Sequence, residues 1–229
     1  MTWVNMETDH VVGLPGKSGD PSPVTAYGVY VGMKAAAKKA YGSDSLEGKK
    51  VMVQGVGHVG EYLVSSLAKE KAEIYISDIH QETLDRVASK YGAKIIALDD
   101  VYTTNMDIYA PCALGATVND ETLSQLNCDI IAGAANNQLA NENIHGKAVM
   151  EKGMIYVPDF MLNAGGVINC YSEVKGLSAE WAMSKAEEIY NTTANILDRS
   201  ANENIPTYSI ANKMAEERVD AIGKVKLPL

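Results

Sequence analysis

The stretch VMVQGVGHVGEYLVSSLAKEKAEIYISD, residues 51–78, decides the fold of this chain. It opens with a short apolar run at residues 51–53, and three glycines follow before a pattern of apolar residues with helical spacing. A second apolar run, residues 74–76, leads to Asp78. Short apolar runs on either side of an amphipathic helix are typical of parallel strands joined by a crossover helix. The stretch therefore predicts a βαβ unit.

The glycines of this unit have the G-x-G-x-x-G spacing of a turn that binds a dinucleotide. Gly55 permits the tight turn, Gly57 lets backbone N–H groups approach a pyrophosphate, and Gly60 lets the helix pack closely on the strand. Asp78 follows at the end of the second strand, where a carboxylate accepts hydrogen bonds from an adenosine ribose and repels a 2′-phosphate, so NAD is favoured over NADP. The predicted cofactor-binding residues here are Gly55, Val56, Gly57, His58, Val59, Gly60, Asp78 and Ile79.

Asp78 also has a purely structural interpretation. Gln81 stands three positions further on, as in a capping box, so the aspartate could instead cap the next helix. The glycines, the flanking strands and the acid taken together favour the dinucleotide interpretation.

Composition limits the kinds of partner. The chain has 229 residues, 46% of them hydrophobic and 21% charged, which is ordinary for a globular protein. A net charge of −9 without any basic run argues against nucleic acid or an anionic membrane as partner, and no apolar run approaches the length of a membrane span. The three cysteines lack C-x-x-C spacing and the four histidines are scattered, so we expect no disulfide framework, no metal site and a cytoplasmic location.

The rest of the chain continues the alternation of helices and strands. We expect helices at about residues 23–41, 81–91 and 143–152, and strands at 94–97, 107–111, 129–133 and 154–157. Ser22 is the expected N-cap of the first helix, with Pro23 in its first turn. The loops after the predicted strands 107–111 and 129–133, residues 112–115 and 134–138, would lie at the carboxyl ends of the sheet, where ligands bind. A plain turn is the alternative for Asn136 and its neighbour Asn137.

The last part of the chain reads as long helices. One apolar stripe contains Ala182, Ala186, Ile189, Thr193 and Ile196, and a second contains Ala211, Ala215, Val219 and Ile222. We interpret both as packing stripes. The predicted fold is α/β, a Rossmann-type doubly wound parallel sheet with additional C-terminal helices. The predicted division is a crossover segment at 1–22, an NAD-binding domain at 23–176 and C-terminal helices at 177–229.

Several longer motifs resemble a known family, the NAD-dependent amino-acid dehydrogenases, and among them the leucine dehydrogenases. The motifs are PSPVTAYGVYVGMKAAAKKAYGSDSLEGK, VQGVGHVGEYL, APCALGATVND, IAGAANNQL, PDFMLNAGGVINCYSE and IPTYSIANKMAEER. The resemblance covers essentially the whole chain. It implies reversible oxidative deamination of leucine and other branched-chain L-amino acids to 2-oxo acids and ammonia, with NAD as cofactor and a homo-oligomeric assembly.

The resemblance also implies roles for individual residues. Thr25 would bond the nicotinamide amide, and Cys112, Ala113 and Asn136 would border the nicotinamide half of the cofactor. For the amino acid, Asn163 would lie near its main chain, while Val167 and Cys170 would line its side-chain pocket. The family usually has valine where this chain has Cys170, which leaves the finer substrate preference open.

The resemblance implies as well that residues acting in catalysis lie outside this sequence. In the family a separate N-terminal domain supplies the substrate-binding and catalytic lysines, and no lysine here stands in a matching motif. We therefore expect the cofactor domain of such an enzyme, with no catalytic residue of its own and residues 1–15 as the end of the crossover segment. Two alternatives stay open: a non-enzymatic NAD-binding regulatory or interaction module, and a phenylalanine or valine dehydrogenase.

Overall fold

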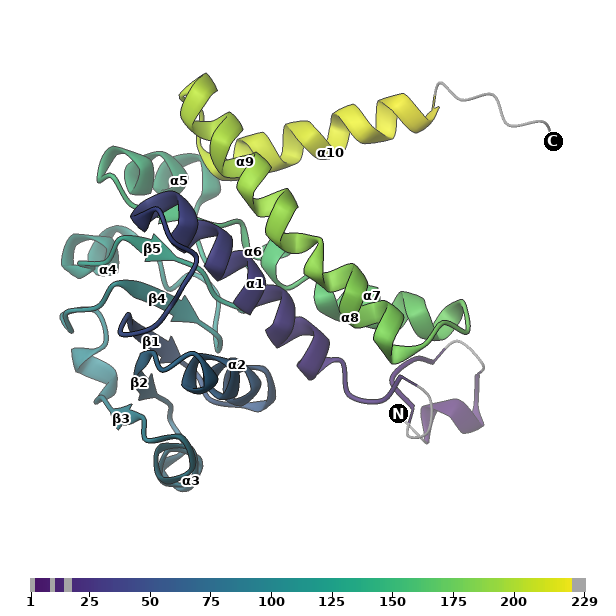
Figure 1. Cartoon of the computed structure of the whole chain (residues 1–229), viewed down its shortest axis with the longest axis horizontal. Helices are drawn as coiled ribbons and strands as arrows, with labels where there is room; N and C mark the ends of the chain where they lie inside the picture. Colours follow the sequence, from purple (N-terminus) through teal and green to yellow (C-terminus); the bar gives the residue numbers. More distant parts are fainter. Residues whose placement is uncertain (1–2, 9–10, 15–17, 224–229) are drawn as a thin grey trace.

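The structure is a computed structural model, and it describes residues 3–8, 11–14 and 18–223. Its centre is a six-stranded parallel sheet in the order β3-β2-β1-β4-β5-β6, with helices on both faces (Figure 1). The strands are β1 (Lys50–Gln54), β2 (Glu73–Ser77), β3 (Lys94–Ile95), β4 (Ile108–Pro111), β5 (Ile130–Ile131) and β6 (Ile155–Tyr156). This order defines a Rossmann-type doubly wound sheet, so the predicted fold class is confirmed.

The helices account for the remaining regular structure. They are α1 (Ser22–Tyr41), α2 (His58–Lys69), α3 (Gln81–Tyr91), α4 (Asp120–Gln125), α5 (Glu142–Glu151), α6 (Asp159–Leu162), α7 (Gly165–Val174), α8 (Ala179–Glu187), α9 (Ile189–Glu203) and α10 (Thr207–Gly223). Two short 3₁₀ helices, η1 (Val4–Met6) and η2 (Leu98–Asp100), complete the list.

Alternate strand residues feed two cores, because successive side chains of a strand point to opposite faces. Val51 and Val53 pack with α1, α2 and α3 on one face, whereas Met52 packs with Tyr109 and residues of α4 and α5 on the other. Helix α10 contacts α5 and α9, whereas α7, α8 and α9 pack on α1. In Figure 1, α1 accordingly lies between the sheet and these helices.

Local chemistry explains where the helices begin and end. Gly42 (φ 75°) and Gly92 (φ 70°) adopt the left-handed conformation that ends α1 and α3, and their N–H groups bond back to Lys38 O and Ala88 O. At the N-terminus of α4, Asn119 and Thr122 form a reciprocal capping box. α1 begins one residue earlier than predicted, because Pro21 is its N-cap and Ser22 is already helical.

Four further predictions are wrong in detail. Three expected strands, at 94–97, 129–133 and 154–157, are each only two residues long. The second C-terminal stripe is not a packing stripe along its whole length: Ala211 is buried, but Val219 and Ile222 are 69% and 58% exposed. The first stripe is confirmed, because all five of its residues are buried.

Candidate functional site

The glycine turn after β1 shows a different physical reason for each glycine. Gly55 has φ +98°, and a Cβ there would lie 2.6 Å from the Cβ of Ala113. A Cβ on Gly60 would lie 2.0 Å from Gly55 O, so only glycine lets α2 start this close to the turn. A Cβ on Gly57 would meet nothing within 4 Å. Gly57 thus borders open space at the N-terminus of α2, where a helix favours an anion.

Asp78 connects the end of β2 to this turn. Its Oδ2 accepts a hydrogen bond from Val56 N at 2.8 Å, and its Oδ1 accepts one from His80 N at 3.0 Å. Each carboxylate oxygen has a second lone pair for a ligand. The alternative that Asp78 caps the next helix is wrong, because the N-cap of α3 is His80. The carboxylate is therefore held at the rim of the turn.

A cavity of about 520 Å³ opens beside the turn, where β1, β2 and β4 end. It lies at the point where the strand order reverses, which is where open α/β sheets bind ligands. Among the predicted residues the structure brings six together in its walls: Gly55, Gly57, Asp78, Ile79, Cys112 and Ala113. Of the other turn residues, Val56 and Gly60 are buried, Val59 is partly buried, and the His58 ring is exposed with its Nδ1 3.3 Å from Asp20 Oδ2.

Cys112 supports the turn, and its thiol is held in the protonated form. Its N–H donates to Gln54 O at 2.7 Å, which joins the end of β4 to the end of β1. Burial raises the pKa of its thiol to about 12, so the thiolate, the reactive form, is scarce at neutral pH.

A second group of predicted residues lies beyond the ends of β5 and β6. Asn163 Nδ2 donates to Asn136 Oδ1 at 2.6 Å and to Ala134 O at 3.1 Å, so two loops distant in sequence are tied together. Asn136 therefore has a structural role, because it joins its own loop to the loop of Asn163. A plain turn, the alternative interpretation of this residue, would not require that contact. The predicted cofactor-facing and substrate-facing amides therefore touch each other.

Thr25 lies near the start of α7. Its hydroxyl donates to Pro21 O at 2.9 Å, and a Cβ on Gly166 would lie 3.0 Å from it. A Cβ on Gly165 would lie 2.2 Å from Val24 O. The double glycine thus lets α7 begin directly against the first turn of α1.

The two predicted side-chain pocket residues lie on α7. Val167 is 74% exposed, and Cys170 is half-buried. Neither contributes to the wall of the cavity beside the glycine turn. Their role toward an amino acid stays a prediction.

Eight residues outside the predicted set and the 112–115 loop also line the cavity: Gln54, Ser77, His80, Leu98, Tyr102, Ala116, Thr117 and Asn119. A signal for two of them was available. Gln54 and Ser77 are polar residues that end apolar strands, directly before Gly55 and Asp78. Leu98 and Tyr102 come from the segment after β3, and nothing local in the sequence points to the cavity there.

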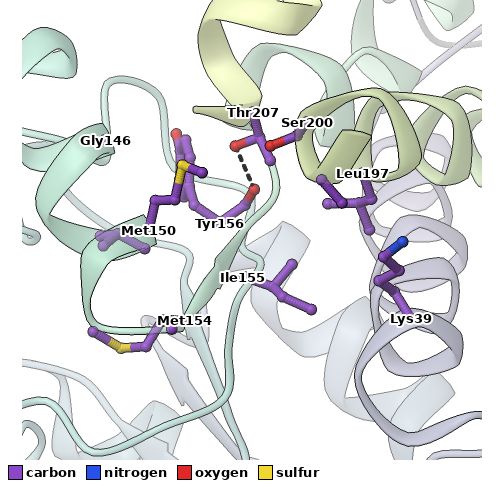
Figure 2. A pocket seen from close by; sticks show the side chains of 12 residues that line it. Lys39, Gly146, Met150, Met154, Ile155, Tyr156, Leu197, Ser200 and Thr207 are labelled. Atoms are coloured by element: carbon purple, nitrogen blue, oxygen red, sulfur yellow. Dashed lines mark hydrogen bonds between the residues drawn. The ribbon is translucent and has the colours of Figure 1, made fainter. Parts of the chain in front are cut away.

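A smaller hollow of about 180 Å³ lies near the start of β6, between α5, α9 and the end of α1 (Figure 2). Its polar groups are already bonded: Thr207 Oγ1 donates to Tyr156 O at 2.7 Å, and Ser200 Oγ donates to Ile205 O at 2.5 Å. Its one cation, Lys39, pairs with Asp198 at 2.7 Å. The hollow therefore offers a ligand little beyond apolar contact.

Among residues 3–8, 11–14 and 18–223, no helix is both long and apolar enough to cross a membrane. Within the same residues, no cluster of three or more His, Cys, Asp and Glu side chains has an arrangement suited to a metal ion.

The strand order places the domain in the Rossmann class of α/β folds, and the glycine turn joined to Asp78 lies where this class binds dinucleotides. Comparison with known sequences is more specific. The model of the Glutamate/Leucine/Phenylalanine/Valine dehydrogenase family matches residues 16–80 and 71–224, and the chain belongs to this family.

Individual relatives agree with this assignment. The chain is 49% identical to leucine dehydrogenase of Thermoactinomyces intermedius over 99% of its own length and 62% of that protein. It is 50% identical to leucine dehydrogenase of Bacillus subtilis over 98% of its length, again 62% of the relative. The chain thus spans about three-fifths of the length of the curated relatives it matches.

Solved structures show the same fold. L-tryptophan dehydrogenase from Nostoc punctiforme superposes with a TM-score of 0.87 at 38% identity, covering 90% of this chain and 61% of that one. A hetero-hexameric glutamate dehydrogenase from Thermus thermophilus gives 0.72 at 18% identity, covering 96% and 57%. At 18% identity the second comparison supports the fold alone.

Proposed function

We propose that this chain binds NAD and serves as the cofactor-binding part of an amino-acid dehydrogenase that acts on leucine and other branched-chain L-amino acids. The observation that carries the proposal is the junction of Asp78 with the glycine turn, where the carboxylate accepts from Val56 N at 2.8 Å. Open space at Gly57 and a cavity of about 520 Å³ leave room for a dinucleotide beside it. Bound there, NAD would supply the hydride acceptor for the oxidation.

The chain's own residues would hold and orient the two reactants. Backbone N–H groups at the start of α2 would bind the pyrophosphate, and Asp78 would bind the adenosine ribose. Thr25 and Asn136 would face the nicotinamide half, with Cys112 and Ala113 beside it. The amino acid would lie against Asn163, Val167 and Cys170. Side-chain preference, cytoplasmic location, self-assembly and the three-part division of the chain stay predictions.

Cofactor selectivity tests the proposal. Titration of the purified chain with NAD and with NADP should show much tighter binding of NAD, because the Asp78 carboxylate repels a 2′-phosphate. Asp78→Ser should weaken NAD by about tenfold, the effect of losing hydrogen bonds to a charged group, and narrow the difference between the cofactors.

Asp85→Ser is the matched control. Asp85 is an exposed residue of α3 outside the cavity, and its replacement changes the net charge equally. This variant should keep the selectivity of the original chain. Equal affinities of the unmodified chain for NAD and NADP would overturn the proposal.

A further inference from the structure

One residue that lines the cavity, Ser77, has a buried hydroxyl without a hydrogen-bond partner in the described part of the chain. Ser77 is 0% exposed, and within the described residues no group hydrogen-bonds to its Oγ. Ser77 nevertheless lines the cavity beside Asp78. A buried polar group without a partner is costly and uncommon in folded proteins, and a ligand in the cavity would supply the missing bond.

Gln54 lies next to Ser77 on the same face of the sheet. The two residues are register partners of β1 and β2, so their side chains leave the sheet side by side. Both line the cavity, and so does Tyr102.

The orientation of the Gln54 amide follows from its partners. Tyr109 is fully buried, and burial raises the pKa of its phenol well above the ordinary value, so Tyr109 keeps its proton. Its hydroxyl donates to Gln54 Oε1. Nε2 is therefore the atom on the other side of the amide, 3.4 Å from the Tyr102 hydroxyl. Since an amide nitrogen has two N–H groups, one of them is left for a ligand.

The position of Gln54 and Ser77 beside Asp78 indicates which part of a ligand these two side chains would contact. If Asp78 binds the adenosine ribose and the start of α2 binds the pyrophosphate, the group of this half of the dinucleotide that still needs a place in the cavity is the base. Leu98, Ile79 and Leu114 also line the cavity, and their apolar side chains suit the faces of a flat ring. The ring edge would then meet a donor at Gln54 and a free hydroxyl at Ser77.

We propose that Gln54 and Ser77, supported by Tyr109 and Tyr102, form a hydrogen-bonding floor that reads the base of the dinucleotide and selects adenine. Gln54 donates to a ring nitrogen, which is an acceptor in adenine but carries hydrogen at the corresponding position in hypoxanthine. Ser77 accepts from the exocyclic amino group of adenine, and it is able to donate to the oxygen that replaces this group in hypoxanthine. Gln54 thus provides selectivity, and Ser77 provides affinity. This inference rests on the proposed function.

The test is calorimetric titration of the full 229-residue chain with NAD and with nicotinamide hypoxanthine dinucleotide. The unmodified chain should bind NAD about 3- to 10-fold more tightly, the usual effect of one hydrogen bond. Ser77→Ala should weaken both ligands by a similar factor while the melting temperature stays equal or rises, because the variant removes an unsatisfied buried group. If Ser77 had a purely structural role, its replacement would not weaken ligand binding while leaving the melting temperature equal or higher.

Gln54→Glu keeps the acceptor for Tyr109 and removes the N–H donor. It should shift the preference toward the hypoxanthine dinucleotide. Ser89→Ala and Gln125→Glu are the controls, since both residues are exposed on helices outside the cavity. Unchanged NAD affinity in Ser77→Ala, or an unchanged ratio in Gln54→Glu, would overturn the base-reading floor and leave NAD binding intact. Failure of the unmodified chain to bind NAD would instead overturn the proposed function, and this inference with it.

Discussion

Two glycines of the turn are under different constraints: Gly60 is required for packing, and Gly57 leaves space for a ligand. Gly60 is fixed by packing, because a Cβ there would overlap Gly55 O at 2.0 Å. Gly57 has no such constraint, and its φ of −66° is accessible to any residue. Substitution of Gly57 is therefore expected to affect ligand binding, whereas substitution of Gly60 is expected to affect stability.

Gly57→Ala should fold with unchanged or slightly higher stability, because alanine restricts the unfolded chain more than glycine does. It should bind NAD more weakly, since the added methyl occupies the space before the N-terminus of α2. Gly60→Ala should lower the free energy of unfolding by several kcal/mol, as expected where buried atoms overlap. Thermal unfolding and NAD titration of both variants check this. A Gly60→Ala variant as stable as the original chain would contradict the packing argument.

At the scale of elements, α10 differs along its length. Its first turns are buried, with Ile210 at 0% exposure in a cluster with Ile196 and Ala211. Farther along, Val219 and Ile222 face away from the described core, and Figure 1 shows this part of α10 extending from the body of the molecule.

Alanine substitutions at two isoleucines of α10 measure this difference. Ile210→Ala should destabilise the chain by about 2–5 kcal/mol, because it opens a cavity among buried side chains. Ile222→Ala should change stability by less than about 0.5 kcal/mol, since it removes surface that water already covers. Denaturant unfolding of both variants provides the measurement. Equal destabilisation would show that Ile222 is packed in solution, for instance against another copy of the chain.

Across the whole molecule, the features that can be predicted from the sequence are those that depend on residues close together in the chain. Apolar runs and glycines at helix ends predict the parallel sheet and most helix limits, and the turn with Asp78 predicts the position of the cavity. Contacts between distant loops, such as Asn163 with Asn136, leave no local pattern. The stripe at Val219 shows a related limit, since periodicity defines an apolar face but not what covers it.

By itself, the 229-residue chain is expected to bind NAD but not to oxidise leucine at an enzymatic rate. Deprotonating the substrate or a water molecule requires a positioned base, typically a group whose pKa is lowered in a cleft. Of the described residues, no lysine or arginine lines the cavity, and the Cys112 thiol has its pKa raised to about 12. Val167, beside the predicted substrate position, is 74% exposed, so water is not excluded there.

The measurement is NADH absorbance after the purified chain is mixed with NAD and leucine. A leucine dehydrogenase of full length, assayed in the same buffer, provides the positive control. Because ordinary enzymes turn over at about 1 per second or faster, we expect a rate far below that value even when calorimetry shows the chain saturated with NAD. Turnover in the ordinary range would mean that a base within these residues performs the chemistry, and His80 or Asp78 in the cavity wall would then be the first groups to replace.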